Sequence, residues 1–333
     1  MLKTLPCSAA TAGADPLRYN VDLPFRATFH PMGYAVEVSS NSPQVVSTAA
    51  KLWQRYPCLS DAQPVRIHII AGGPQPDSPR QRTRPRGEAH LFSIVHGPHD
   101  FAFADLSTGF AFASLSDESI SDPASLGYYF LEPLTYAMLG ARSFVFVHAS
   151  CISRGGKAIV LCGASGSGKT CLAYACARRG WDYVSGDAVH IVRVQQNRTV
   201  IGRPYEIRFR ESALDVFPEL ASWRAEARPN GKIDLEIDAE ELGISTSLSC
   251  SARHIVFIER SNVTSLEPFP CEQALRNLQE TICYGDQQTR REQHEALADF
   301  ARLPCWLLYH SDLDKAERTL ERLLADERLL ADE

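Results

Sequence analysis

The segment GASGSGKT at residues 163–170 constrains the fold of this chain more than any other part of the sequence. It fits the pattern Gly-x-x-x-x-Gly-Lys-Ser/Thr of a phosphate-binding loop in full. Such a loop needs a strand that enters it and a helix that leaves it. The apolar segment 157–163 predicts the strand, and segment 169–179, followed by Gly180, predicts the helix. This context predicts an α/β unit that holds a nucleotide phosphate.

The residues of this loop have separate predicted roles in holding ATP and Mg²⁺. Glycines are needed because backbone N–H groups must turn towards the phosphates, and side chains would block that approach. Lys169 can reach the β- and γ-phosphates, and the Thr170 hydroxyl is placed to bind Mg²⁺. The helix N-terminus adds the positive end of its dipole. The predicted nucleotide-binding residues are Gly163, Ala164, Ser165, Gly166, Ser167, Gly168, Lys169 and Thr170.

Composition narrows the classes of partner. The chain has 333 residues, 44% of them hydrophobic, and a net charge of −6. This length favours two domains, and without a long basic run neither nucleic acid nor a membrane surface is an expected partner. Because the sequence shows no signal peptide and no apolar stretch of about 18 residues, we expect a cytoplasmic protein. The ten cysteines are scattered without a Cys-x-x-Cys pair, which predicts reduced thiols rather than a metal site.

Two regions of different pattern follow one another along the chain. Residues 1–140 predict a β-rich α+β N-terminal domain, because short alternating segments are separated by Gly, Pro, Asp and Ser. Residues 141–333 predict an α/β domain built around the phosphate-binding loop. Further expectations are helices near 43–55 and 123–140, a Pro- and Arg-rich exposed loop at 72–88, and an amphipathic terminal helix at 312–333.

The acidic residue that follows the loop helps to indicate which reaction the bound nucleotide undergoes. Motor proteins and GTPases usually show an apolar strand that ends in Asp, and no convincing strand of that kind follows the loop. The nearest acid at a strand end is Asp187, in the segment YVSGDAVHI. Phosphoryl transfer to a hydroxyl needs a positioned base for the hydroxyl proton. Asp187 is the candidate for that base, and capping of the turn after Gly186 is its alternative role.

Several segments share their order with a known family. His148 lies in FVHAS ahead of the loop, the loop helix ends in CARRG, and the segment SGDAVHI follows it. In this order they resemble the catalytic domain of the HPr kinase/phosphorylase family, and the resemblance covers about residues 143–310. That family has Asp-Asp-x-Val where this chain has SGDAVHI. The resemblance aligns Asp187 with the family's proton acceptor and Gly186 with the first Asp of the pair.

The same resemblance extends to two later segments. PYEIRF contains Glu206 and Arg208 where the family has Glu-Ile-Arg, and SARHIVFIER contains Arg253 ahead of an apolar strand. It implies an HPr-kinase-like P-loop kinase domain in which Thr170 and Glu206 hold Mg²⁺. It also implies that Asp187 accepts the proton, while Lys169 holds the triphosphate and Arg253 and His148 offset charge on the transferring group. Lys232, in RPNGKIDLEI, is open between phosphate stabilisation and a surface hairpin.

The acceptor is less well defined. The segment 279–300 does not match the family's loop for its carrier-protein substrate, and residues 1–140 do not resemble its regulatory domain. Some relatives phosphorylate precursor peptides of lasso peptides. We therefore expect an ATP-dependent serine kinase that acts on a Ser or Thr hydroxyl of a peptide or small protein, with the N-terminal domain recognising that acceptor. A kinase for a small-molecule hydroxyl, a non-catalytic nucleotide sensor, and homo-oligomerisation all stay open.

Overall fold

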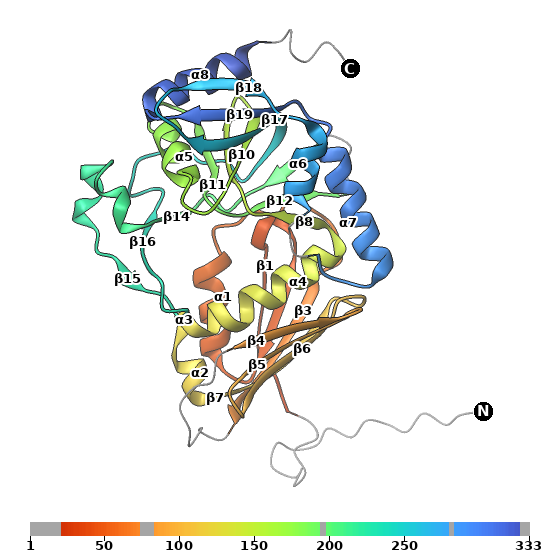
Figure 1. The fold of residues 1–333 in the computed structure, drawn as a ribbon. Coiled ribbons are helices and arrows are strands. Elements are labelled where there is room, and N and C mark those ends of the chain that lie inside the picture. Colours follow the sequence, from red (N-terminus) through yellow and green to blue (C-terminus); the bar gives the residue numbers. More distant parts are fainter. Residues whose placement is uncertain (1–20, 74–82, 194–197, 280–282, 327–333) are drawn as a thin grey trace.

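The computed structural model describes residues 21–73, 83–193, 198–279 and 283–326. Within these residues the chain is a mixed α/β protein with two large mixed sheets (Figure 1). The N-terminal sheet lies below and the C-terminal sheet above in that view, and helix α4 lies where they meet. In the part of the chain that the structure describes, no helix is long and apolar enough to cross a membrane.

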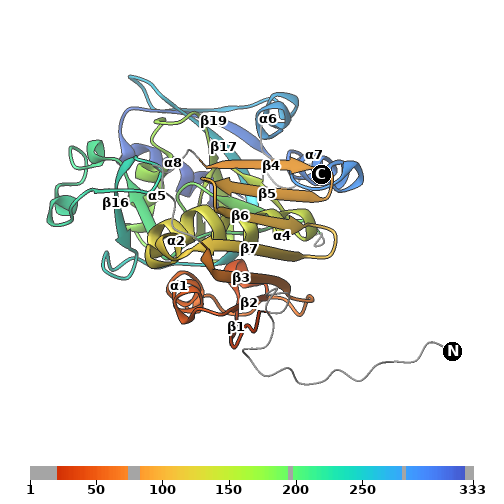
Figure 2. The ribbon, with the colours of Figure 1, turned by 90° about the horizontal axis from the view of Figure 1, so that it is seen from below.

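The N-terminal sheet has the strand order β1-β2-β3-β7-β6-β5-β4, seen from below in Figure 2. Strands β2, β3 and β7 run parallel, and the other neighbours pair antiparallel. The strands are β1 (Phe25–Phe29), β2 (Val36–Ser40), β3 (Val65–Gly73), β4 (Arg84–Glu88), β5 (Leu91–His96), β6 (Asp100–Asp105) and β7 (Phe110–Ser116). The helical segments are η1 (Pro31–Gly33), α1 (Pro43–Trp53), α2 (Asp117–Ser121), α3 (Pro123–Leu126), η2 (Gly127–Leu131) and α4 (Glu132–Arg142).

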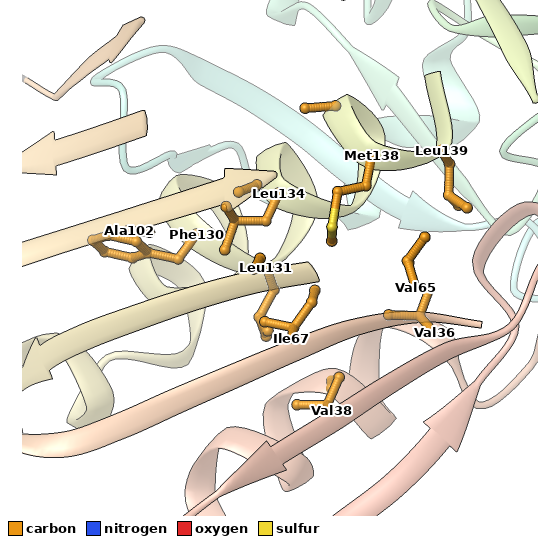
Figure 3. Close-up of a cluster of buried hydrophobic side chains, with 14 of the residues drawn as sticks. Val36, Val38, Val65, Ile67, Ala102, Phe130, Leu131, Leu134, Met138 and Leu139 are labelled. Atoms are coloured by element: carbon orange, nitrogen blue, oxygen red, sulfur yellow. The ribbon is translucent and has the colours of Figure 1, made fainter. Parts of the chain in front are cut away.

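The core of this region follows from alternating side chains. Along β6 the residues alternate between buried and exposed, as expected for an antiparallel strand with one covered face. Phe103 is 54% exposed, whereas its neighbours Ala102 and Ala104 are buried. Side chains from β2, β3 and the segment η2–α4 point towards one another in Figure 3: Val36, Val65, Ile67, Leu131, Leu134 and Met138. Burial of such side chains supplies most of the stability of the region.

The C-terminal sheet has the order β11-β9-β10-β17-β13-β12-β8, and β19 with β18 extends it beside β17. Its strands are β8 (Phe144–Val147), β9 (Ser150–Arg154), β10 (Lys157–Cys162), β11 (Asp182–Ser185), β12 (Val189–Val192), β13 (Thr199–Ile201), β17 (Ser249–Arg260), β18 (Ser265–Pro268) and β19 (Cys305–His310). The helices of this region are α5 (Lys169–Ala177), α6 (Cys271–Leu278), α7 (Gln287–Phe300) and α8 (Leu313–Ala325). Strands β10, β17 and β19 run parallel, so their carboxyl ends meet at one edge of the sheet.

A small antiparallel sheet projects from the C-terminal region (Figure 1). This arm consists of β14 (Glu206–Phe209), η3 (Glu211–Ala213), η4 (Pro218–Ser222), β15 (Glu226–Ala227) and β16 (Ile233–Asp238). It contacts the N-terminal region at two places. Arg55, which follows α1, forms an ion pair with Asp238, and the Asn230 side chain donates a hydrogen bond of 2.8 Å to the Tyr128 hydroxyl. The arm therefore bridges the two regions.

Most predicted elements agree with these bounds. The predicted helix at 123–140 is interrupted by the π-helical turn η2, and the predicted terminal helix is helical from Leu313 to Ala325, with 327–333 outside the described residues. Residues 84–88 of the predicted exposed loop form the edge strand β4, while 74–82 lie outside the described residues. The predicted boundary at 140/141 remains a prediction. Phe144, Val192 and Ile201 belong to the same hydrophobic cluster as the N-terminal strands.

Candidate functional site: the phosphate-binding loop and the Asp187 turn

The predicted loop connects β10 to α5, as its sequence requires. Gly163 has a φ of +145°, and a Cβ built there would lie 2.8 Å from the carbonyl oxygen of Ile258. Gly168, the N-cap of α5, has a φ of +100° and accepts a hydrogen bond from the Leu172 N–H at 2.8 Å. Any other residue would be strained at these positions. The loop therefore has the backbone freedom, close packing and helix N-terminus that a phosphate cradle needs.

Lys169 is folded over this loop. Its Nζ donates hydrogen bonds to the carbonyl oxygens of Gly163 at 2.7 Å and Ala164 at 3.1 Å. The residue is only 6% exposed, and burial lowers the pKa of Lys169 below its ordinary value. Phosphate oxygens in the loop would offer the ammonium group a stronger, charge-assisted partner than these neutral carbonyls.

Three further basic side chains, which the sequence did not indicate as site residues, lie at the loop. Arg210 donates a hydrogen bond of 2.8 Å from its guanidinium to the Ser165 hydroxyl. His310 contacts the Ser167 carbonyl oxygen through Nε2 at 3.2 Å. A Cβ built on Gly168 would lie 3.9 Å from the Arg260 Nε.

Arg260 and His310 are register partners at the ends of β17 and β19. The rule that ligands bind beyond the carboxyl ends of parallel strands could have pointed to both residues, once the strand order was known.

The turn that carries Asp187 is hydrogen-bonded to the loop helix. The Gly186 carbonyl oxygen accepts hydrogen bonds from the Thr170 hydroxyl at 3.1 Å and from the Ser150 hydroxyl at 2.5 Å. His148 contacts the Asp187 carbonyl oxygen through Nδ1 at 3.0 Å. The structure thus brings His148, Thr170 and Asp187 together, although they come from three separate segments. Asp187 itself is exposed at the surface of the turn.

Glu206, at the start of β14, lines a cavity of about 200 Å³ together with Gly186, Asp187 and Arg208. Partial burial raises the pKa of Glu206, and the neighbouring Glu236 carboxylate acts in the same direction. A cation in this cavity would oppose both effects, because it favours the ionised carboxylate.

A Mg²⁺ ion that also contacts phosphate oxygens needs only one or two protein ligands, and Thr170 with Glu206 supply a hydroxyl and a carboxylate of suitable chemistry. The described residues contain no group of three or more His, Cys, Asp or Glu side chains arranged for a metal ion.

Asp187 also lines a larger cavity, of about 1000 Å³. Its lining includes His148 and Asp187 from the loop side, Tyr128 and Tyr129 from the N-terminal region, and Lys232 from the arm. Tyr129 stacks on His96 with 4.6 Å between ring centroids. The cavity is therefore bounded by both sheets and by the arm, and Asp187 connects its lining to the turn that is hydrogen-bonded to Thr170.

Arg253 does not lie near the loop, in contrast to its predicted role. It sits in an irregularity of the pairing between β17 and β10, opposite Ala158 and Ile159 at the start of β10. The loop follows the other end of β10, after Cys162. Four residues of strand correspond to about 13 Å, which is too far for contact with a phosphate in the loop. The arginine of β17 that reaches the loop is Arg260.

Comparison with known proteins adds a partial structural similarity. No protein-family profile matches the sequence, and no curated protein matches it. Among solved structures, the HPr(Ser) kinase/phosphatase from Coxiella burnetii is similar to this chain, with 13% sequence identity and a TM-score of 0.29. The similarity covers 56% of this chain and 91% of that chain.

Proposed function

We propose that this chain is an ATP-dependent kinase that transfers a phosphoryl group to a Ser or Thr hydroxyl of a peptide or small protein. The observation that supports this most is the position of Asp187. Its turn is hydrogen-bonded to Thr170 of the loop helix, and Asp187 also lines the large cavity. A carboxylate at the border between a phosphate cradle and a cavity of acceptor size suits a base that works between two substrates.

In this proposal the residues act mainly by position and charge. The Asp187 carboxylate accepts the proton of the acceptor hydroxyl. The hydroxyl oxygen of the acceptor forms a bond to the γ-phosphorus of ATP, and the bond between that phosphorus and ADP breaks. Lys169, Arg210 and Arg260 offset negative charge on the triphosphate from the loop side. His148 holds the Asp187 turn through its backbone contact. Mg²⁺, held by Thr170 and Glu206, would neutralise charge on the phosphate oxygens.

The large cavity supports a peptide as the acceptor. Its volume of about 1000 Å³ is at the upper end of the range for small-molecule sites. Tyr128, Tyr129 and Lys232 offer aromatic faces and a positive charge for side chains of a bound segment. Ribosomal precursor peptides of the lasso type are the first candidates, because relatives in the resembled family act on them.

The direct test is intact-mass spectrometry of candidate precursor peptides after incubation with the full chain and Mg·ATP. We expect a gain of one phosphoryl group that maps to a Ser or Thr and is lost in the Lys169→Ala variant. The full chain is needed because the hydrophobic core extends across the predicted domain boundary.

The same assay, run with a panel of small hydroxyl compounds, distinguishes the remaining functions. Phosphorylation of a small compound but of no peptide would replace the peptide acceptor by a small-molecule one. Nucleotide binding without transfer to either class would contradict the kinase and support the sensor.

A further inference from the structure

Tyr183 of β11 presents a buried hydroxyl whose presence needs an explanation. The residue is 0% exposed, and the hydroxyl oxygen has no hydrogen-bond partner in the structure. The backbone of Tyr183 is fixed by two hydrogen bonds to the segment 245–247. The Tyr183 N–H donates to the Ser245 carbonyl at 2.8 Å, and its carbonyl accepts from the Ser247 N–H at 3.0 Å. Because buried polar groups are nearly always paired, this rigidly held and unpaired hydroxyl is a candidate for contact with a bound molecule.

The hydroxyl lies at the turn between the loop helix and Asp187. A Cβ built on Gly186 would lie 2.3 Å from the Tyr183 hydroxyl oxygen and 3.3 Å from Cγ2 of Thr170. Tyr183 therefore occupies the space that a side chain at position 186 would need, next to the predicted Mg²⁺ ligand Thr170. It also lines the cavity of about 200 Å³ that contains Asp187 and Glu206.

We propose that the Tyr183 hydroxyl donates a hydrogen bond to a phosphate oxygen of the bound Mg·ATP, in the space left free by Gly186. This inference rests on the proposed function. A phenol at this place supplies a donor without adding negative charge, which suits a partner that is itself negatively charged. Tyr183 is then a substrate-contacting residue that replaces a side chain from position 186.

The charge state of Tyr183 fits this role. Burial raises the pKa of the Tyr183 hydroxyl well above its ordinary value of 10.0, and the nearby Asp187 carboxylate raises it further. The hydroxyl therefore keeps its proton at neutral pH and stays a donor. An ionised phenolate would instead repel the phosphates.

The first test is isothermal titration of the full chain with Mg²⁺ and a non-hydrolysable β,γ-imido ATP. Tyr183→Phe removes only the hydroxyl oxygen. We expect its Kd for the analogue to rise about tenfold, the size of one hydrogen bond to a charged partner. The melting temperature without nucleotide should stay the same or rise, because the lost hydroxyl had no partner in the free chain. A purely structural hydrogen-bonding role would predict the reverse, lower stability with unchanged binding.

Matched controls separate this inference from the proposed function. Tyr174→Phe changes a tyrosine on α5 whose hydroxyl contacts Glu219 at 3.5 Å, and should leave binding unchanged. Lys169→Ala should abolish binding. If the wild-type chain binds and Tyr183→Phe binds equally well, the inference is overturned and the kinase proposal stands. If the wild-type chain does not bind the analogue, both are overturned.

The shared space gives a second, independent test. Gly186→Asp should lower the melting temperature strongly, because its side chain would collide with the Tyr183 hydroxyl. In the Tyr183→Leu background the same substitution should be tolerated, with a smaller loss of melting temperature. If Gly186→Asp lowers the melting temperature equally in both backgrounds, Tyr183 does not occupy the space that a side chain at position 186 would need.

Discussion

Thr170 and Gly186 are joined by a hydrogen bond of 3.1 Å from the Thr170 hydroxyl to the Gly186 carbonyl oxygen. The bond links the first turn of the loop helix to the turn that carries Asp187. A nucleotide that draws the Thr170 hydroxyl towards a metal ion would remove this donor, while Ser150 continues to hold the same carbonyl at 2.5 Å. The Asp187 turn is therefore held in place while Thr170 is free to change its partner.

Asp187→Asn should separate catalysis from binding. The amide cannot accept the hydroxyl proton, so the rate of transfer should fall by about a hundredfold or more. Affinity for Mg·ATP should change little, because the proposed role of Asp187 is to accept a proton and not to hold the nucleotide. Initial rates by mass spectrometry and titration calorimetry measure the two quantities. Asp215→Asn, at an exposed carboxylate of the arm, is the control; transfer by Asp187→Asn at the control rate would show that another group is the base.

Two arginines of one strand should behave differently. Arg260 lies beside Gly168, so Arg260→Ala should weaken Mg·ATP binding about tenfold through loss of a charge-assisted contact. Arg253→Ala should leave the affinity within about twofold, because Arg253 lies opposite the start of β10. Calorimetric titration of both variants checks this pair. A larger loss from Arg253→Ala than from Arg260→Ala would restore the role that the sequence first indicated for Arg253.

The ion pair between Arg203 and Glu132 should be important for stability. The two groups lie 2.5 Å apart with side chains 19% and 11% exposed, and the Tyr136 hydroxyl donates to Glu132 at 2.9 Å. Glu132→Gln would leave the buried Arg203 guanidinium without its carboxylate partner, so the free energy of unfolding should fall by about 3 kcal/mol.

Urea denaturation measures this loss against a matched exposed pair. Arg154 and Glu321 form an ion pair whose side chains are 44% and 49% exposed, so Glu321→Gln should cost less than about 1 kcal/mol. Equal, small losses in the two variants would mean that water reaches the Arg203–Glu132 pair.

Mild acid should destabilise the fold through buried histidines. Burial lowers the pKa of His190 and of His254 to about 4, below the ordinary value of 6.5. Above pH 6.5 both histidines are neutral in folded and unfolded chains and do not affect stability. Below pH 6.5 the unfolded chain binds protons that the folded chain does not. The free energy of unfolding should therefore fall by about 2 kcal/mol per histidine between pH 7.5 and pH 5.

A substitution at His254 tests whether this histidine contributes to the loss of stability in acid. His254 accepts a hydrogen bond of 3.3 Å from the Trp306 ring N–H, which only a deprotonated Nδ1 can do. His254→Gln keeps an acceptor but cannot titrate, so its loss of stability between the two pH values should be smaller than that of the wild type. The exposed His294→Asn should leave the loss unchanged. Equal pH dependence in all three proteins would rule His254 out as a source.

Much of the local structure was predictable because it depends on short-range patterns. The loop sequence, the strand before it and the helix after it follow from glycine positions and apolar periodicity, and β10, α5 and the turn at Gly186 agree with them. The terminal helix and the helix near 43–55 have the same origin. These features need no knowledge of distant contacts.

The sequence by itself determined the glycine-rich loop at 163–170 and the strand and helix on either side of it. Only the tertiary structure decided which distant residues share the site. It placed Arg260 and His310 at the loop, which the sequence did not indicate, and left Arg253 at the far end of its strand. The physical reason is strand register: a shift of a few residues along a strand moves a side chain by about 10 Å, and pairing across the sheet fixes that shift.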